Sequence, residues 1–487
     1  EYYDLKVNNY DKKVKNYDFN ALAREQQLKT DNSWKRSLEL YISILRFMFG
    51  DSVGRVPVSS IARNMLSFAS PYSVTAESLS EFNNILKDFL RILDKNIQKY
   101  TAGNFFAMNG IWINRVIIGW LGWELTNLAS WVGFLSFLLF APTIIAGPIF
   151  GVIIDRIDIK KFAIYTQSII SITVFILWFL YFFGYLNIYN LSAIALNIGV
   201  FTSADRATRM SLVPRIVDRD TLANAIAVHG INFNSARLMG PALAGILIKV
   251  IGFKATIFIN FLFLIIMPLT LYIITVKDRD ASNQKKKNLF SEFLDGVRFV
   301  LNHTVIFEAC AITAVFSFFA RGTVEIFPAI AGGVFEVGAG GLGQMMATAG
   351  AGALVAAIFI AMRRSKDQEK GIPLRVYFSS FMGLVAIIIL AISNSWLIAL
   401  SSIFIIGYSM TVNGIDLQAV VQLELNDSYR GRVMSLWVVL VIGLAAISAI
   451  LMGIFGDLIG IRNILVISSL LGITSLIALL LLLKKKI

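Results

Sequence analysis

The sequence predicts an all-α membrane protein with twelve transmembrane helices in two six-helix halves, preceded by a soluble helical extension. The chain of 487 residues is 56% hydrophobic and only 15% charged, whereas soluble domains carry about 25% charged residues. After residue 100, apolar runs recur that are long enough to cross a hydrocarbon core of about 30 Å. The two halves of this apolar region also repeat each other.

Residues 1–99 are predicted to form the extension, because they hold 15 Lys or Arg and 12 Asp or Glu. Ser78 with Glu81 three residues later is typical of a helix start. The apolar residues that follow have helical spacing: Phe82, Ile85, Leu86, Phe89, Leu90, Leu93 and Ile97. We expect such helices to pack on one another rather than lie on the membrane surface, and a protein partner is a further interpretation of this segment.

Twelve apolar segments follow the extension. They are predicted at 104–125, 130–154, 162–184, 189–213, 222–250, 255–275, 304–328, 341–362, 374–393, 396–422, 433–456 and 462–483. The longest polar interruption, residues 277–303, contains three consecutive lysines and an amphipathic run from Phe290 to Leu301. It is interpreted as a cytoplasmic linker between one half at 104–276 and another at 304–483.

The positive charges predict the orientation of these spans, because Lys and Arg are retained on the cytoplasmic side of short loops. Loops after even-numbered spans, together with the C-terminal tail, hold 21 Lys or Arg, whereas loops after odd-numbered spans hold 3. Both termini are therefore expected in the cytoplasm. The net charge of +13 has this topological explanation, so nucleic acid is not expected as a partner.

An internal repeat favours two duplicated halves around a central site, a common transporter design. The segment from Gly245 to Lys254 matches the segment from Gly453 to Arg462 at an offset of 208. The loop around Asp218 matches the loop around Asp427 at an offset of 209. Two matches at nearly one offset, on corresponding elements, indicate a duplication.

Ionisable residues inside the predicted spans are candidate functional residues, because each costs a few kcal/mol unless it is paired or hydrated. Those that we single out are Arg115, Asp205, Arg206, Arg209, Arg237, Arg321, Glu325 and Asp416. All except Arg237 lie in spans 1, 4, 7 and 10, which suggests a shared polar cavity. Asp205 with Arg209, and Arg321 with Glu325, have the spacing of intrahelical ion pairs, and pairs that only stabilise helix packing are the alternative.

The carboxylates and the arginines suggest different roles. Glu325 and Asp416, with Asp205, are candidates for proton coupling, because a carboxylate in a partly dehydrated cavity can exchange a proton near neutral pH. The arginines at 115, 206, 209, 237 and 321 are candidates for binding an anionic or carbonyl-bearing substrate. Aromatic residues could contact a bulky ligand, although such residues more often face lipid or pack: Trp112, Trp120, Trp123, Phe316, Phe318 and Phe319.

Other classes of function find little support in the sequence. Cys310 is the only cysteine, so no intrachain disulfide and no cysteine-based metal site is expected. His229 and His303 lie far apart without zinc spacing, and structural or solvated roles are expected for both. We find no nucleophile and base pattern, so neither an enzyme nor a cofactor is predicted.

Two motifs resemble those of the major facilitator superfamily, over residues 104 to 483. After span 2 the chain has Gly151, Asp155, Arg156, Lys160 and Lys161. This pattern is similar to the superfamily's cytoplasmic gate motif, although Asp158 and Ile159 stand where Gly and Arg are usual. The resemblance implies that Asp155 and Arg156 join a charge network that latches the two halves on the cytoplasmic side.

The second motif, Gly240, Pro241 and Gly245 in span 5, resembles the Gly-Pro motif of the superfamily's exporters. Such residues bend a helix and allow close approach to its neighbour. With "ADRATRMSLVPRIV", "RGTVEIFP" and "DSYRGRVMSL", the chain resembles the bacterial branch that contains the enterobactin exporter and macrolide efflux proteins. The resemblance implies a multi-pass inner membrane protein that exports a siderophore or drug by proton antiport.

The leading hypothesis is therefore a secondary transporter of a small molecule that works by alternating access, with protons as the coupling ion. Uptake of a nutrient or metabolite is the second transport hypothesis. A third, from another class, is a transport-inactive membrane scaffold or sensor whose extension binds a partner. The charges inside the spans argue against this third hypothesis.

Overall fold

Helices account for nearly all of the chain that the structure describes. The computed structural model describes residues 95–154, 157–217, 222–276, 289–362 and 371–484. The chain divides into two compact units, one made of Glu1–Gln98 with Ala223–Val228 and the other of Lys99–Leu222 with His229–Ile487. The second unit contains the features discussed below. The predicted extension at 1–99 and the first half of the linker at 277–303 lie mostly outside the described residues.

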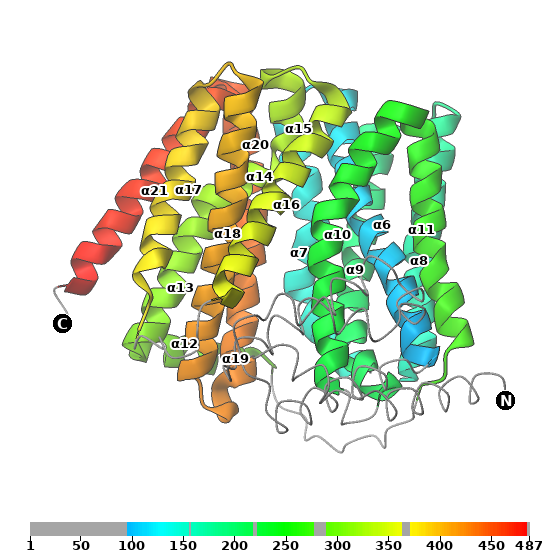
Figure 1. Ribbon diagram of the computed structural model, residues 1–487, viewed down its shortest axis with the longest axis horizontal. Helices are drawn as coiled ribbons and strands as arrows, with labels where there is room; N and C mark the ends of the chain where they lie inside the picture. The colour runs from blue at the N-terminus through cyan, green and yellow to red at the C-terminus, as the bar shows by residue number, and fades with distance from the viewer. Residues whose placement is uncertain (1–94, 155–156, 218–221, 277–288, 363–370, 485–487) are drawn as a thin grey trace, which may run out of the picture. The chain divides into compact units, whose positions relative to one another are not determined.

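The first predicted half corresponds to six helices (Figure 1). They are α6 Lys95–Thr126, α7 Ala129–Ile154, α8 Ile159–Phe182, α9 Ile188–Ile216, α10 Leu222–Ile251 and α11 Phe253–Ile273. Within this half, α7 packs on α9, and α8 packs on both α9 and α11. The helix α6 begins earlier than the predicted start of span 1 at residue 104.

The second half has more interruptions. A short helix, α12 Leu289–Asn302, precedes it. The span 7 region consists of α13 Thr304–Phe316, η3 Ser317–Arg321, α14 Gly322–Glu325, α15 Phe327–Ala329 and η4 Ile330–Val334. The remaining elements are α16 Gly338–Met362, α17 Leu374–Ile392, α18 Trp396–Glu424, α19 Asp427–Val438, η5 Val439–Gly443, α20 Leu444–Ile459 and α21 Ile461–Lys484. The η elements are π-helical turns, which often occur at functional sites.

Eight of the described helices are long and apolar enough to cross a membrane. They correspond to α8, α11, the α13 to α14 segment, α16, α17, α18, the α19 to α20 segment and α21. In α7, the stretch Ala129–Ile144 is apolar. In α6 and α9 the apolar run is interrupted by polar residues, including Arg115 in α6 and Asp205 in α9. The same residues that suggest function therefore weaken the hydropathy signal of these two helices.

Equivalent turns support the predicted repeat. Gly252 separates α10 from α11 with φ 84°, and Gly460 separates α20 from α21 with φ 92°. Glycine is the residue that adopts positive φ without steric cost. These two glycines are 208 positions apart, which is the offset found in the sequence.

The two halves contact each other toward one end of the helices, which we call the distal side. It is the side where α6 ends and α7 begins, and the opposite side is called proximal. The carboxylate of Asp457, near the end of α20, accepts hydrogen bonds from the backbone amides of Ala129 (2.7 Å) and Ser130 (3.0 Å) at the start of α7. Because these amides are the free donors of a helix start, Asp457 caps α7 from the other half.

Small residues bring the two halves together at the same end. A Cβ atom added to Gly133 of α7 would lie 2.2 Å from the carbonyl oxygen of Ala449 in α20. One added to Gly453 of α20 would lie 2.4 Å from the carbonyl oxygen of Ala129. Only glycine permits this separation of the two backbones. The contact between α7 and α20 therefore depends on the absence of side chains at these positions.

Candidate functional site

The central feature of the site is an ion pair between the two halves. Arg115 of α6 donates through Nη2 to Oε1 of Glu325 in α14. The Glu325 side chain is 9% exposed and that of Arg115 is 18% exposed. The second carboxylate oxygen of Glu325 is buried without a hydrogen-bond partner. One of the two oxygens of this carboxylate is therefore free to accept a hydrogen bond or a proton.

Aromatic rings hold the Arg115 guanidinium beside Glu325. Its central carbon lies 5.3 Å from the ring centroid of Trp112 and 5.0 Å from that of Phe140. Both contacts are within the range of favourable cation–π interactions. The hydroxyl of Ser136 on α7 donates to the backbone carbonyl of Glu325 at 3.4 Å. Helices α6 and α7 of the first half thus position a side chain of the second.

Two further arginines lie near this pair. The positive charges of Arg237 on α10 and Arg321 in η3 repel each other. The positive charge of Arg115 also repels that of Arg237. Arg321 donates through Nη2 to the backbone carbonyl of Met410 at 3.2 Å. Neither Arg237 nor Arg321 has a carboxylate within ion-pair distance in the described part of the chain.

The backbone around Arg321 departs from regular α-helix. The π-helical turn Ser317–Arg321 precedes Gly322, where an added Cβ atom would lie 2.1 Å from Oγ of Ser448 on α20. Ser448 donates to the carbonyl of Phe318, which lies inside this turn. The sequence spacing predicts a pair between Arg321 and Glu325, but Glu325 pairs with Arg115 instead. Arg321 extends toward α18, where Gly414 leaves room for its Nη2 atom.

A second polar cluster lies in the first half. The Asp205–Arg209 pair predicted from the sequence spacing is present, with Nε of Arg209 2.6 Å from Oδ2 of Asp205 and both side chains 3% exposed. Arg209 also donates to Oδ1 of Asn104 on α6, whose amide nitrogen lies 3.4 Å from Nδ1 of His229 on α10. This cluster connects α9, α6 and α10. Arg206, the next residue after Asp205 on α9, is exposed and interacts with the charge of Asp205.

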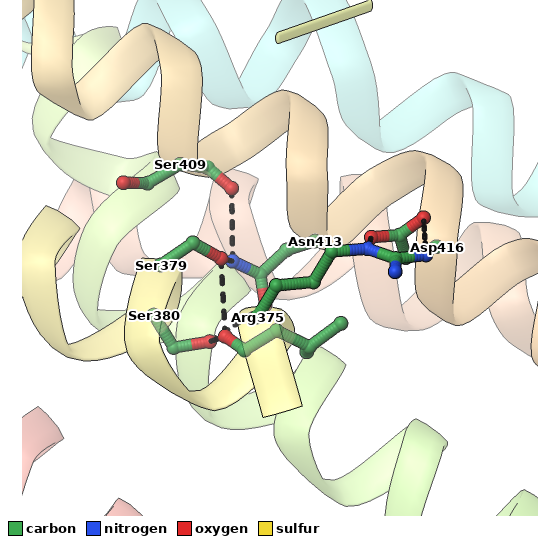
Figure 2. Close-up of polar contacts among 7 residues, drawn as sticks. Arg375, Ser379, Ser380, Ser409, Asn413 and Asp416 are labelled. Carbon is green, nitrogen blue, oxygen red and sulfur yellow. Dashed lines mark hydrogen bonds and ion pairs between the residues drawn. The ribbon is translucent and has the colours of Figure 1, made fainter. Parts of the chain in front are cut away.

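A third cluster connects α17 and α18, as Figure 2 shows. Arg375 donates to both oxygens of Asp416, through Nε at 2.6 Å and Nη2 at 3.1 Å. One turn away, Asn413 accepts from the Ser380 hydroxyl at 2.7 Å and donates to Ser379 Oγ at 3.2 Å. Two-point binding of a carboxylate by a guanidinium is a strong, geometrically specific contact. Asp416, which has no partner in its own span, therefore has one on the neighbouring helix.

We expect the Asp416 pair to be asymmetric in its effect on stability. Arg375→Gln should destabilise the protein toward the lower end of about 3–5 kcal/mol, since it leaves a carboxylate that is 5% exposed without its bidentate partner. Asp416→Asn should cost less, because Arg375 is 29% exposed and can reach solvent. Thermal unfolding of the purified protein measures both. Equal losses, with no recovery in the double variant, would contradict this asymmetry.

The gate motif after span 2 is only partly described. Asp155 and Arg156 lie outside the described residues, and Gly151 is in α7. Asp158 caps α8 by accepting from the backbone amides of Lys160 (3.0 Å) and Lys161 (3.1 Å). The hydrogen bond from the Lys161 amide is the largest of the contributions that lower the pKa of Asp158. The departure at position 158 thus has a local structural role as a helix cap.

The Gly-Pro motif of span 5 forms close helix contacts. A Cβ atom added to Gly240 would lie 2.6 Å from Cβ of Trp112, so α10 lies directly against α6 beside the Arg115 site. One added to Gly245 would lie 3.1 Å from Cα of Gly343 in α16. Pro241 lies inside α10. The motif therefore brings α10 against a helix of each half.

Several residues of these clusters are not predicted by sequence. Arg375 is counted among the loop charges, although it lies in the first turn of α17. Asn104, Asn413 and Phe140 carry no charge, and only their position inside an apolar run could have marked the two asparagines. Glu308, which accepts from the Tyr377 hydroxyl, lies near the start of α13 and inside the predicted span at 304–328, yet it is not among the predicted candidates.

Most of the sequence matches a known family. Residues 97–486 match the profile of the family described as transmembrane secretion effector. The chain is 23% identical over 348 residues to macrolide efflux protein A of Streptococcus pyogenes. The aligned residues make up 70% of this chain and 84% of that protein. It is 22% identical over 152 residues to the staphyloferrin A transporter of Staphylococcus aureus, or 31% of this chain and 38% of that protein's length.

Solved structures share the fold. A bacterial homologue of the human lysosomal transporter Spinster, inward-facing and unoccupied, superposes with a TM-score of 0.63 at 13% identity, over 80% of this chain and 98% of that chain. A nucleoside transporter superposes with a TM-score of 0.62 at 11% identity, over 79% of this chain and 99% of that chain. The family match extends over most of the chain and includes every cluster described above. The chain belongs to the transmembrane secretion effector family of the major facilitator superfamily, and it is a transporter rather than an enzyme.

Proposed function

We propose that the protein is a secondary active exporter of a small molecule, built from twelve spans in two halves that alternate access to a central site. The observation that carries the proposal is the Arg115–Glu325 ion pair, because it joins the two halves at a polar position inside apolar helices. A pair between halves can form in one conformation and break in the other. Such two-state contacts are what alternating access requires.

The orientation proposed from the positive charges makes the proximal side cytoplasmic and the distal side external. The contacts between α7 and α20, including the Asp457 cap, then close the external side. This arrangement corresponds to a conformation that faces the cytoplasm. An exporter in this state would receive its substrate from the cytoplasm.

Three carboxylates are proposed for proton coupling, and their different partners support an order among them. Glu325 is the first candidate, since it lies between the halves and has one buried oxygen without a partner. Asp416 and Asp205 each pair with an arginine of their own half. A proton that neutralises Glu325 would release Arg115 and weaken the attraction between α6 and α14. Protonation at this position would thereby affect the contact between the two halves.

The relatives favour export over uptake. Macrolide efflux protein A is named for efflux, and the family is described as one of secretion effectors. The staphyloferrin A transporter adds a siderophore-related compound as a second class of cargo among the relatives. We therefore propose a siderophore or drug-like compound as the substrate. Uptake of a nutrient is the alternative that the direction of flux would distinguish.

The direction of flux tests the proposal. In inverted membrane vesicles energised to acidify their lumen, an exporter should accumulate its substrate inside, and a protonophore should abolish the accumulation. Candidate compounds are first selected by their ability to raise the unfolding temperature of the purified protein. Accumulation in right-side-out vesicles instead would favour uptake, and no flux of any stabilising compound in either preparation would oppose both.

A further inference from the structure

We propose that the central cluster binds an organic anion, a carboxylate attached to an apolar or aromatic body, between Arg237 of the first half and Arg321 of the second. This inference rests on the proposed transport function and specifies its substrate class. The cluster contains three guanidinium groups and one carboxylate. Arg115 pairs with Glu325, and Arg321 lies four residues before Glu325. Arg237 lies on α10 between Phe233 and Gly240, which both lie against Trp112 beside Arg115. With all four ionised, two positive charges remain uncompensated.

An excess of positive charge inside apolar helices needs a reason, because uncompensated charges in such a position are costly. The other buried arginine of the first half, Arg209, has a carboxylate partner, and so does Arg375 in the second half. Arg237 and Arg321 have none in the described part of the chain. Carboxylates of the same half thus neutralise Arg209 and Arg375, whereas Arg237 and Arg321 are left for a ligand to neutralise.

The two arginines are positioned to bind one ligand from both halves. The α10 backbone at Arg237 packs against α16, since a Cβ atom added to Gly350 would lie 2.9 Å from Cα of Leu238 and 3.4 Å from the carbonyl oxygen of Arg237. Arg321 comes from η3 and uses one of its donors on the Met410 carbonyl. Guanidinium groups bind carboxylates in a planar, two-point geometry. An anion between them would also offset their mutual repulsion.

Aromatic side chains beside the cluster favour a ligand with an apolar body. Phe233 lies one helical turn before Arg237 on α10, is 40% exposed, and its ring centroid is 6.3 Å from that of Trp112. Trp112 in turn lies beside Arg115. Large apolar surface next to a few fixed polar groups is the usual composition of a small-molecule site. A cationic ligand would be repelled by the net charge of the same site.

Matched probes test the inference on the full chain in lipid nanodiscs. Isothermal titration with 2-naphthoate and with its neutral analogue 2-naphthamide compares ligands of nearly equal size. We expect the carboxylate to bind at least tenfold more tightly than the amide. Arg237→Gln and Arg321→Gln should each remove at least tenfold of the naphthoate affinity, with little change for the amide. Arg298→Gln, which removes an exposed charge on α12, is the control and should leave both affinities unchanged.

Other results would overturn the inference. Equal affinities for the carboxylate and the amide would do so, as would full naphthoate binding in both glutamine variants. Inorganic phosphate that binds as tightly as naphthoate would exclude the apolar body. If a glutamine variant does not purify as a folded protein, Arg321→Lys keeps the charge without the planar fork and should bind naphthoate with intermediate affinity.

A flux measurement separates this inference from the proposed function. If the wild-type protein transports the cation ethidium but neither binds nor transports 2-naphthoate, the proposed transport function is supported and the proposed anion site is contradicted. If 2-naphthoate binds through Arg237 and Arg321 but no compound is transported in either direction, the proposed anion site is supported and the proposed transport function is contradicted.

Discussion

Replacing Glu325 by glutamine is expected to reduce proton-driven transport at least tenfold in proteoliposomes, while exchange of substrate across the membrane without a gradient continues. Glutamine has the shape of the acid but can neither ionise nor take up a proton. Net movement of protons needs that change of charge, whereas exchange of one substrate molecule for another does not. The variant should also bind 2-naphthoate at least as tightly as the wild type does, because a negative charge next to the proposed anion site is removed.

The control for this prediction is Glu336→Gln, which neutralises an exposed carboxylate near the distal end of the same span. It should transport like the wild type. Unchanged proton-driven flux in Glu325→Gln would exclude Glu325 as the coupling residue. Asp416→Asn and Asp205→Asn would then be tested in the same way. Loss of both driven flux and exchange would instead indicate a defect in substrate binding or folding.

The fold is predictable from this sequence to the extent that it depends on local patterns. Apolar runs and helix-breaking loops lie close together in the chain, and the predicted segments therefore coincide with helices to within a few residues at most ends. The Asp205–Arg209 pair is local in the same sense, since four residues on one helix bring the two side chains together. Such contacts follow from helix geometry alone.

The partners of the other charges depend on tertiary structure. Glu325 has Arg321 at the spacing of an intrahelical pair, yet it binds Arg115, which is 210 positions away. Asp416 binds Arg375, which is 41 positions away and begins a neighbouring helix. No periodicity in a single sequence encodes these contacts. The ionisable residues themselves could be selected because charge inside apolar helices is rare, but their pairing could not be derived.

For the glycines, too, some contacts can be predicted from the sequence and others depend on tertiary structure. A glycine inside an apolar helix indicates a close approach of two backbones but does not identify the partner helix. The Gly-Pro motif predicted such an approach for α10, and Gly240 lies against α6 beside Trp112. The sequence indicates no helix contact for Gly133, and it indicates Gly453 only as part of the repeat, although both glycines let α7 and α20 approach closely. Their significance follows from the position of these helices on opposite halves.

Introducing valine at Gly133 is expected to open the distal side and to block transport. The new Cβ atom would lie 2.2 Å from the Ala449 carbonyl oxygen and 3.1 Å from the Cα atom of Ile450, and both belong to the backbone of α20. A backbone cannot move aside as a flexible side chain can, so α7 and α20 must separate. Because these helices belong to different halves, separation changes the relation of the halves more than the packing within either one.

Spin labels on the two halves measure this separation. Tyr185 and Leu397 are 68% and 75% exposed and lie at the distal ends of the first and second halves, respectively. With Cys310→Ala removing the only native thiol, cysteines at these positions can be labelled selectively. Gly133→Val should shift the distance distribution to longer values, whereas Gly340→Val, where an added Cβ atom meets nothing within 4 Å, should not. An unchanged distribution with normal transport would mean that the contact between α7 and α20 does not close the distal side. A longer distance with transport abolished would make that contact one of the two states of the cycle, because a carrier held open on one side cannot complete alternating access.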